Sequence, residues 1–133
     1  MKLLINTKMK KKDKSTSWYL KKADKVFSDF IRQRDKGVCC TCGNKKEWKY
    51  QQAGHYEKRS CLALRFNEKN VNCQCVRCNI FLKGNYPAYS RFLMKKYGDN
   101  ILYELEEIVK ESKRTIKKYG KDFYKYIINI YGK

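Results

Sequence analysis

Apolar side chains in the first third of the chain follow the spacing of one helical face. These positions are Leu20, Ala23, Val26, Phe27, Phe30 and Ile31. Ser17 is a suitable N-cap and Gly37 a suitable stop, so the pattern predicts an amphipathic helix between them. The opposite face carries Lys21, Lys22, Lys25, Arg32 and Arg34. That basic face is either solvated or turned toward phosphates.

The pattern changes to alternation in the middle of the chain. From Glu47 to Ala53, aromatic residues alternate with polar ones, which predicts a short strand ending at Gly54 and His55. Residues 56–69 are irregular and read as a surface loop, and residues 70–74 are a candidate second strand. Residues 75–81 can then turn into a helix. We therefore expect a hairpin followed by a helix.

The last third returns to helical spacing. Asn85 can cap a helix that has Pro87 in its first turn and ends at Gly98. Asp99 or Asn100 then caps another helix, which is expected to run to Tyr119 and Gly120. Residues 123–131 are aromatic and β-branched, so helix is favoured and strand stays open. The expected fold class is α+β, with C-terminal helices from about residue 86 packed on the hairpin.

Length and charge placement predict one domain with a basic arm. A chain of 133 residues is too short for two sizeable cores. Residues 1–16 carry six lysines and little to bury, so we expect a flexible arm there and a single domain over residues 17–133. The arm is either a solvated tail or a segment that follows phosphates.

The net charge of +19 predicts a polyanionic partner. Nucleic acid is the first candidate, because phosphate neutralisation by lysine and arginine provides most non-specific affinity. A membrane is a weaker candidate, since the apolar run of residues 3–5 is much too short to span a bilayer or to form a secretory signal. We therefore expect DNA as partner, no membrane, and a cytoplasmic location.

Two Cys-x-x-Cys pairs, Cys39 with Cys42 and Cys75 with Cys78, are typical of a structural zinc site. Each pair directs two thiolates at one centre, and zinc prefers four such ligands in a tetrahedron. The chain has seven cysteines, an odd number that argues against a disulfide framework and for a reducing compartment. Cys40, Cys61 and Cys73 are expected to be spectators.

The single histidine, His55, lies between the two cysteine pairs. Because four cysteines can complete the zinc site, His55 is free to act as a base, a proton carrier or a ligand of a second metal. Read alone, it is also compatible with an ordinary surface or hydrogen-bonded residue.

The order of these residues resembles the HNH, or ββα-metal, endonucleases in their zinc-stapled form. Three segments in order, residues 53–56, 64–70 and 74–79, together with Lys83-Gly84-Asn85, resemble the phage lambda NinG (Rap) recombination-protein family. The resemblance covers roughly residues 18–93, and none of these motifs falls in the two helices expected after Gly98.

The resemblance implies a structure-selective DNA endonuclease that cuts branched recombination intermediates, such as Holliday junctions and D-loops. By resemblance, His55 would be the base, Asn79 would bind the catalytic Mg²⁺ or Mn²⁺, and Asn70 would brace the loop that orients them. The zinc would be structural only. The residues expected to contact DNA phosphates are Lys58, Arg59, Arg65, Arg77 and Lys83.

Gly54 departs from the pattern of many HNH enzymes, which place a metal-binding Asp directly before the histidine. The catalytic metal must then find another anionic ligand, for which Glu57 and Glu68 are the candidates, or His55 itself binds metal and cannot also serve as base.

Two alternatives to a junction endonuclease stay open. One is a non-catalytic, zinc-binding DNA module, which the missing Asp at position 54 favours. The other is a sequence-specific HNH enzyme of the restriction or homing type. A homodimer is expected for a junction enzyme, because a substrate with two-fold symmetry is best cut by two related sites.

Overall fold

The computed structural model describes residues 12–115 and 119–133. The expected basic arm falls largely on residues 1–11 and therefore lies outside the described residues. The described part is rich in helices and contains a small two-stranded antiparallel sheet, which confirms the α+β class. Within it, no helix is both long enough and apolar enough to cross a membrane.

Helix α1 spans Thr16–Arg34 and buries the predicted apolar face through Ala23, Phe27 and Ile31. The expected N-cap was wrong by two positions. Ser15 has the extended backbone of a cap, and its hydroxyl accepts a hydrogen bond from the Trp18 N–H at 3.1 Å, so Ser17 already lies in the helix. At the other end, Lys36 and Gly37 have positive φ angles, which stops the helix.

The hairpin pairs β1 (Gln52–His55) with β2 (Val71–Gln74). Its register sets Gln52 opposite Gln74 and His55 opposite Val71. The strand expected from Glu47 was wrong over its first half, because Trp48–Tyr50 form a 3₁₀ turn, η1. In the expected loop, α2 (Leu62–Arg65) is a single helical turn.

Four helical segments follow β2. They are η2 (Arg77–Phe81, with π-helical bonding), α3 (Tyr86–Tyr97), α4 (Ile101–Arg114) and α5 (Lys121–Tyr131). The helix expected from Asn100 to Tyr119 ends earlier, at Arg114, since Thr115 is extended. Residues 116–118 of that expected helix lie outside the described residues. The last segment is a helix, which decides between the two structures expected there.

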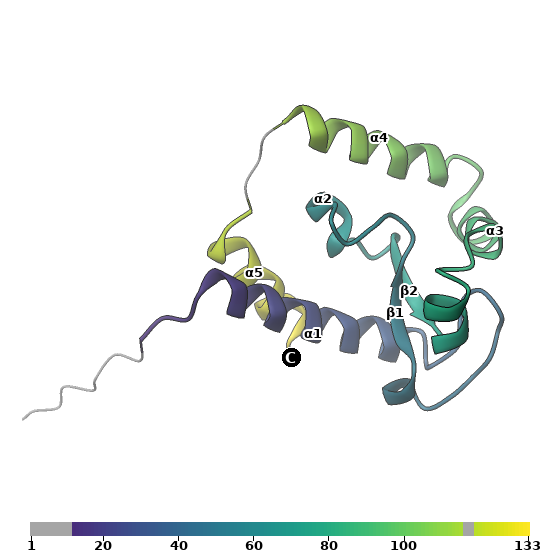
Figure 1. Ribbon diagram of the computed structural model, residues 1–133, viewed down its shortest axis with the longest axis horizontal. Coiled ribbons are helices and arrows are strands. Elements are labelled where there is room, and N and C mark those ends of the chain that lie inside the picture. Colours follow the sequence, from purple (N-terminus) through teal and green to yellow (C-terminus); the bar gives the residue numbers. More distant parts are fainter. Residues whose placement is uncertain (1–11, 116–118) are drawn as a thin grey trace, which may run out of the picture.

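Two apolar clusters hold these elements together. In the first, α1 and α5 lie side by side (Figure 1), and their apolar faces meet Phe66 and Val71. In the second, Leu64 of α2 packs against α3 and α4 on the other side of the hairpin. The sheet residues alternate accordingly: Ala53 and Val71 belong to the α1 side, whereas the Asn72 amide contacts Tyr89 of α3. The hairpin is thus enclosed on both faces.

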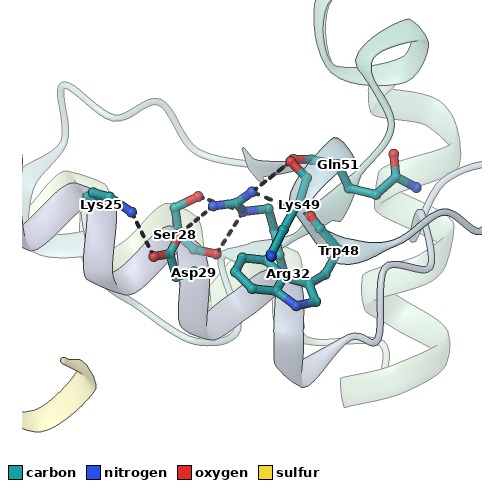
Figure 2. A network of polar contacts seen from close by, with 7 residues as sticks. All are labelled: Lys25, Ser28, Asp29, Arg32, Trp48, Lys49 and Gln51. Carbon is teal, nitrogen blue, oxygen red and sulfur yellow. Dashed lines mark hydrogen bonds and ion pairs between the residues drawn. The ribbon is translucent and has the colours of Figure 1, made fainter. Parts of the chain in front are cut away.

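Arg32 ties the start of the hairpin to α1 (Figure 2). Its guanidinium donates to the carbonyl oxygens of Trp48, Lys49 and Gln51 at 3.3–3.4 Å and lies over the Trp48 ring, 5.1 Å from its centroid. Asp29 and the Ser28 hydroxyl orient the guanidinium from within α1. The Trp48 carbonyl also accepts the Gln51 N–H, and Arg32 adds a donor to it and to the Lys49 and Gln51 carbonyls at the point where η1 ends and β1 begins.

Candidate metal centre and the surroundings of His55

The four predicted zinc ligands come together in space. The Sγ atoms of Cys39, Cys42, Cys75 and Cys78 all lie within 4.8 Å of one another. The Cys42 and Cys75 sulfurs are 3.7 Å apart, close to the roughly 3.8 Å edge of a tetrahedron with 2.3 Å zinc–sulfur bonds. The first pair lies between α1 and η1, and the second follows β2. These cysteines therefore form a site that can bind a metal such as zinc.

The thiol pKa values show why a cation suits this cluster. Burial raises the pKa of Cys39, but hydrogen bonds from the Thr41 hydroxyl and nearby backbone N–H groups outweigh it and bring the pKa to about 6. Burial and the adjacent thiols raise the pKa of Cys42 to about 12. One thiolate thus forms readily and disfavours the next, and a divalent cation would remove that penalty.

Hydrogen bonds to sulfur surround the cluster. The backbone N–H groups of Asn44 and Cys78 donate to Cys42 and Cys75 Sγ, each at 3.4 Å, and Asn85 Nδ2 donates to Cys78 Sγ at 3.6 Å. Asn85 thus occupies the predicted N-cap position of α3, but its side chain makes no capping hydrogen bond, and its amide donates to the cysteine site instead. Hydrogen bonds of this kind, from N–H groups to sulfur, stabilise thiolates and orient them toward a metal.

The three remaining cysteines lie outside the cluster. Burial raises the pKa of Cys73 to about 12 and also raises that of Cys40, so both thiols stay protonated near neutral pH. Cys61 is half-buried near Ser112 of α4.

His55 ends β1 with one ring nitrogen engaged. Its Nε2 lies 3.0 Å from the Arg65 carbonyl oxygen, so Nε2 carries the proton and donates, which leaves Nδ1 as the acceptor. Burial, opposed only in part by this bond, lowers the pKa of His55 to about 4. The imidazole is therefore neutral near pH 7, in a fixed orientation and tautomer.

Asn70 is fully buried beside the turn that follows His55. Its Oδ1 accepts from the Glu57 N–H at 2.7 Å, and its Nδ2 donates to the carbonyl oxygens of Glu57 and Leu64. These bonds join the end of β1 to α2, the two segments that place His55 and its carbonyl partner. Asn70 thus braces the loop around the histidine.

Asn79 lies in η2, and its Nδ2 donates to Gln52 Oε1 of β1 at 2.7 Å. Gln52 and His55 are three positions apart in the strand, so their side chains point to opposite faces. The structure therefore places Asn79 and His55 near the same hairpin but at different faces and ends of β1.

Steric crowding explains why position 54 is a glycine in this chain. A Cβ at position 54 would lie 1.8 Å from Gln74 Oε1. The Gln74 amide is held there because its Nε2 donates to the Gly84 carbonyl at 2.9 Å and to the Thr41 hydroxyl at 3.2 Å. Among the described residues, Gln74 Oε1 has no hydrogen-bond partner although it is buried. The Gln74 side chain thus fills the space that an Asp at position 54 would need.

Glu57 and Glu68, the acidic residues expected to bind a second, catalytic metal, do not form a metal site with His55. Within residues 12–115 and 119–133, the four cysteines are the only group of three or more His, Cys, Asp or Glu residues placed to hold a metal. Glu68 Oε2 accepts from the Tyr131 hydroxyl of α5 at 2.9 Å. Glu57 lines a groove of about 660 Å³ with Tyr56, Tyr86 and α4 residues. The protein groups described around His55 alone do not fit Mg²⁺ or Mn²⁺, which prefer carboxylates.

Four of the five expected phosphate-binding residues are exposed, namely Lys58, Arg59, Arg77 and Lys83. Arg65, the fifth expected residue, differs from these four because its side chain is not exposed. Its guanidinium is 11% exposed and forms a two-bond ion pair with Asp24 of α1, at 2.8 and 2.6 Å. The Arg65 side chain is therefore engaged in an ion pair inside the protein. Its contribution to the site is its backbone carbonyl, which accepts the hydrogen bond from His55.

Two residues of this neighbourhood were missed from the sequence. Asp24 sits on α1 among lysines and gives no local sign of a distant partner. Tyr89, fully buried in α3, donates its hydroxyl to the Gly54 carbonyl at 2.6 Å and fixes the strand before His55. A signal for Tyr89 exists, because it lies one helical turn before Leu93 and so extends the apolar stripe of α3.

The fold and site define a small α+β protein with a four-cysteine metal centre beside a histidine-bearing hairpin. This chain belongs to the NinG family: the family profile described as "Bacteriophage Lambda NinG protein" matches residues 4–131. The expected family is confirmed. The nuclease activity expected with it stays a prediction.

The curated relatives are phage proteins, each named "Protein ninG". The chain is 34% identical to that of Escherichia phage lambda over 108 residues, which cover 78% of this chain and 52% of the relative. It is 34% identical to that of Salmonella phage P22 over 106 residues, covering 77% and 51%. For Escherichia phage 933W the identity is 35% over 97 residues, covering 70% and 47%. The chain thus spans about half the length of these relatives, and no solved structure gives a significant match.

Proposed function

We propose that this protein is a zinc-stapled DNA endonuclease of the HNH type that cuts branched DNA by phosphodiester hydrolysis. The single observation that carries the proposal is the arrangement of His55. Its Nε2 is held by the Arg65 carbonyl at 3.0 Å, which leaves Nδ1 free to accept a proton from water. This bond gives the imidazole one fixed tautomer, in which Nδ1 is the nitrogen that can accept a proton.

The low pKa of His55 is compatible with this role. A base with a pKa of about 4 is weak, but it is fully deprotonated at neutral pH. Bound DNA would bring phosphate charge next to the imidazole, and a nearby negative charge raises a histidine pKa toward the range suited to proton transfer. We therefore propose His55 as the group that removes the proton from the attacking water.

In this proposal zinc is structural. Four thiolates leave a tetrahedral zinc no open position for water, so the metal would hold the two cysteine pairs and thereby the hairpin and η2. Mg²⁺ or Mn²⁺ enters as a requirement to be tested. When bound, such a cation would stabilise the charge that develops on the phosphate. Asn79 Oδ1 is the ligand oxygen that the resemblance implies, but Asn79 lies at the other face and end of β1 from His55 and does not complete a cation site with it in this structure.

The charge of +19 and the exposed Lys58, Arg59, Arg77 and Lys83 support DNA as the substrate. We further propose that the active species is a homodimer, since a four-way junction presents two related strands for cutting. Sedimentation with and without a junction tests this part separately.

The decisive experiment compares cleavage of a four-way junction, a D-loop and the linear duplex arms, with Mg²⁺, Mn²⁺ or chelator. The proposal requires cleavage of the branched substrates by wild type and its loss in His55→Ala. Asn100→Ala, a change at the exposed start of α4, is the control and should cut normally. Uncut branched DNA under all cation conditions, or undiminished cutting by His55→Ala, would reject it. Equal cutting of the duplex arms points instead to the sequence-specific HNH alternative.

A second candidate is a non-catalytic zinc module that docks on DNA. The specific observation in its favour is that no carboxylate joins His55 in a metal-binding group within the described residues. Junction binding that persists with no cation-dependent cleavage would select this function.

A further inference from the structure

The turn after β2 exposes a run of apolar side chains. Val76 is 39% exposed, Ile80 54%, Phe81 74% and Leu82 41%. We call these four residues the apolar tip. Phe81 is the most exposed large apolar residue of residues 12–115 and 119–133. Consecutive apolar residues left in water are unfavourable for a folded protein unless they meet a partner.

The backbone of the apolar tip is held in place. Cys78, in the centre of η2, belongs to the four-cysteine cluster, and the Leu82 N–H donates to the Arg77 carbonyl at 2.8 Å. The Gly84 N–H donates to the Cys78 carbonyl at 2.9 Å, where Lys83 and Gly84 turn the chain with positive φ angles. The metal site and these bonds therefore present Phe81 outward on a rigid turn.

The charge around the apolar tip favours nucleic acid over a second copy of this chain as its partner. Arg77 and Lys83 flank the exposed Ile80-Phe81-Leu82 run, and both are exposed. No aspartate or glutamate occurs in the sequence between Glu68 and Asp99. A second copy meeting this face would bring like charges together, whereas nucleic acid offers phosphates to the cations and base faces to the apolar side chains.

Position relates the apolar tip to the proposed nuclease. Asn79 lies within the same turn and bonds to Gln52 of β1, the strand that ends in His55. The apolar tip thus lies near the end of β1 opposite to His55, and a DNA strand that runs along β1 would meet both. Aromatic and aliphatic side chains that enter a base step must unstack it, which costs less where stacking is already broken.

We propose that the apolar tip, with Phe81 at its point, is a wedge that inserts between the weakly stacked bases of a branch point, unstacks them, and so provides the preference for branched over linear DNA. This inference rests on the proposed function for its setting, but it concerns recognition rather than hydrolysis. The substrate class that it names is DNA with an interrupted base stack.

The test measures binding, so that it does not depend on cleavage. A four-way junction carries 2-aminopurine at the branch point, in buffer with neither added Mg²⁺ or Mn²⁺ nor chelator, so that the zinc site is kept. Its fluorescence and dissociation constant are compared with those of a linear duplex of equal length. For wild type we expect tighter junction binding and a rise in fluorescence as the base unstacks. Phe81→Ala should weaken junction binding on the order of 10-fold, remove the fluorescence rise and leave duplex binding unchanged.

Two variants and a metal measurement serve as controls. Tyr103→Ala removes another aromatic side chain, 64% exposed on α4, and should behave as wild type. Phe81→Trp should restore the fluorescence rise. Zinc content equal to wild type establishes that Phe81→Ala retains the metal-bound turn.

Several outcomes would overturn the inference. Junction binding and fluorescence by Phe81→Ala that match wild type reject the wedge. So does a dimer that Phe81→Ala dissolves while junction preference persists, since the occupant is then a second copy. Phe81-dependent binding to vesicles of anionic lipid, without junction preference, rejects it as well. His55→Ala separates the two proposals: it should keep the fluorescence rise, and a wild type that shows the rise but never cuts supports the wedge while rejecting the nuclease.

Discussion

His55 Nε2 and the Arg65 carbonyl oxygen lie 3.0 Å apart, and this bond connects the histidine to α1. The guanidinium of Arg65 is held by both carboxylate oxygens of Asp24, which lies 41 residues earlier in α1. The order Asp24, Arg65, His55 is thus a chain of contacts from the longest helix to the candidate base. Asp24 and Arg65 act as positioning residues for the imidazole.

Replacing Asp24 with Asn should impair the site through this chain of contacts. The Arg65 side chain loses a charged partner, so its carbonyl and His55 are held less firmly. We expect a loss of about 1–3 kcal/mol in the free energy of unfolding, measured by urea denaturation, because the pair is mostly buried. Junction cleavage should fall through kcat, with a shifted acid limb in its pH profile. Asp99→Asn, at an exposed position, is the control; equal effects of the two changes would contradict the positioning role.

Stability should depend on pH through His55. Its pKa is lowered from 6.5 to about 4 in the folded chain, so the unfolded chain binds the proton more readily. The contribution is complete above pH 6.5 and is lost as the pH falls from 6.5 toward 4. Between pH 7 and pH 5, wild type should lose about 2 kcal/mol more than His55→Gln does, by urea denaturation at each pH. Parallel pH curves for the two proteins would rule out this assignment. Zinc dissociates at low pH from both proteins, so its effect on stability cancels when wild type is compared with His55→Gln.

Zinc should be bound at one equivalent per chain and should be lost from Cys78→Ser but not from Cys61→Ser. Cys78 is buried in the four-cysteine cluster, whereas Cys61 lies outside it. Because metal affinity contributes directly to folding, chelation or the Cys78 change should lower the melting temperature strongly. Metal analysis and thermal melting measure both effects. Retention of a full equivalent by Cys78→Ser would mean that the metal, if bound, lies elsewhere.

Arg32→Lys should destabilise the fold although it keeps the charge. A lysine cannot donate to three carbonyl oxygens in a plane while lying over the Trp48 ring. We expect a loss of about 1–3 kcal/mol in the free energy of unfolding, together with a shift in Trp48 fluorescence. The matched control, Arg91→Lys at an exposed position of α3, should change the free energy little. Equal stability of both variants would show that Arg32 does not hold η1.

Gly54→Ala should be destabilising because the new methyl group collides with the Gln74 side chain, and Gln74→Ala should relieve that collision. The added methyl group would displace the Gln74 amide from its bonds to Gly84 and Thr41. We expect a loss of about 1–3 kcal/mol, and a smaller added loss when the same change is made in Gln74→Ala, where the space is open. A double-mutant cycle by urea denaturation measures the difference. Strict additivity would show that Gln74 is not the obstacle.

The amino-acid sequence by itself determined the features that local geometry encodes. Helical spacing placed α1, α3 and α4, because a helix repeats its buried face every turn. The two Cys-x-x-Cys turns placed the metal ligands, because that spacing directs both sulfurs of a pair to one point. The motifs around His55 also placed the chain in the NinG family.

Only the tertiary structure decided the polar contacts between distant segments. Arg65 carries the same charge as Arg77, yet its contact with Asp24 exists only because the fold brings the last residue of α2 to α1, and no local pattern records that approach. The same holds for Gln74 filling the space at Gly54, and for Arg32 converting an alternating stretch into η1. The exposure of Phe81 was likewise decided in three dimensions, since apolarity alone predicts burial. Here a turn that contains Cys78 and is closed by its own backbone hydrogen bonds leaves the ring exposed.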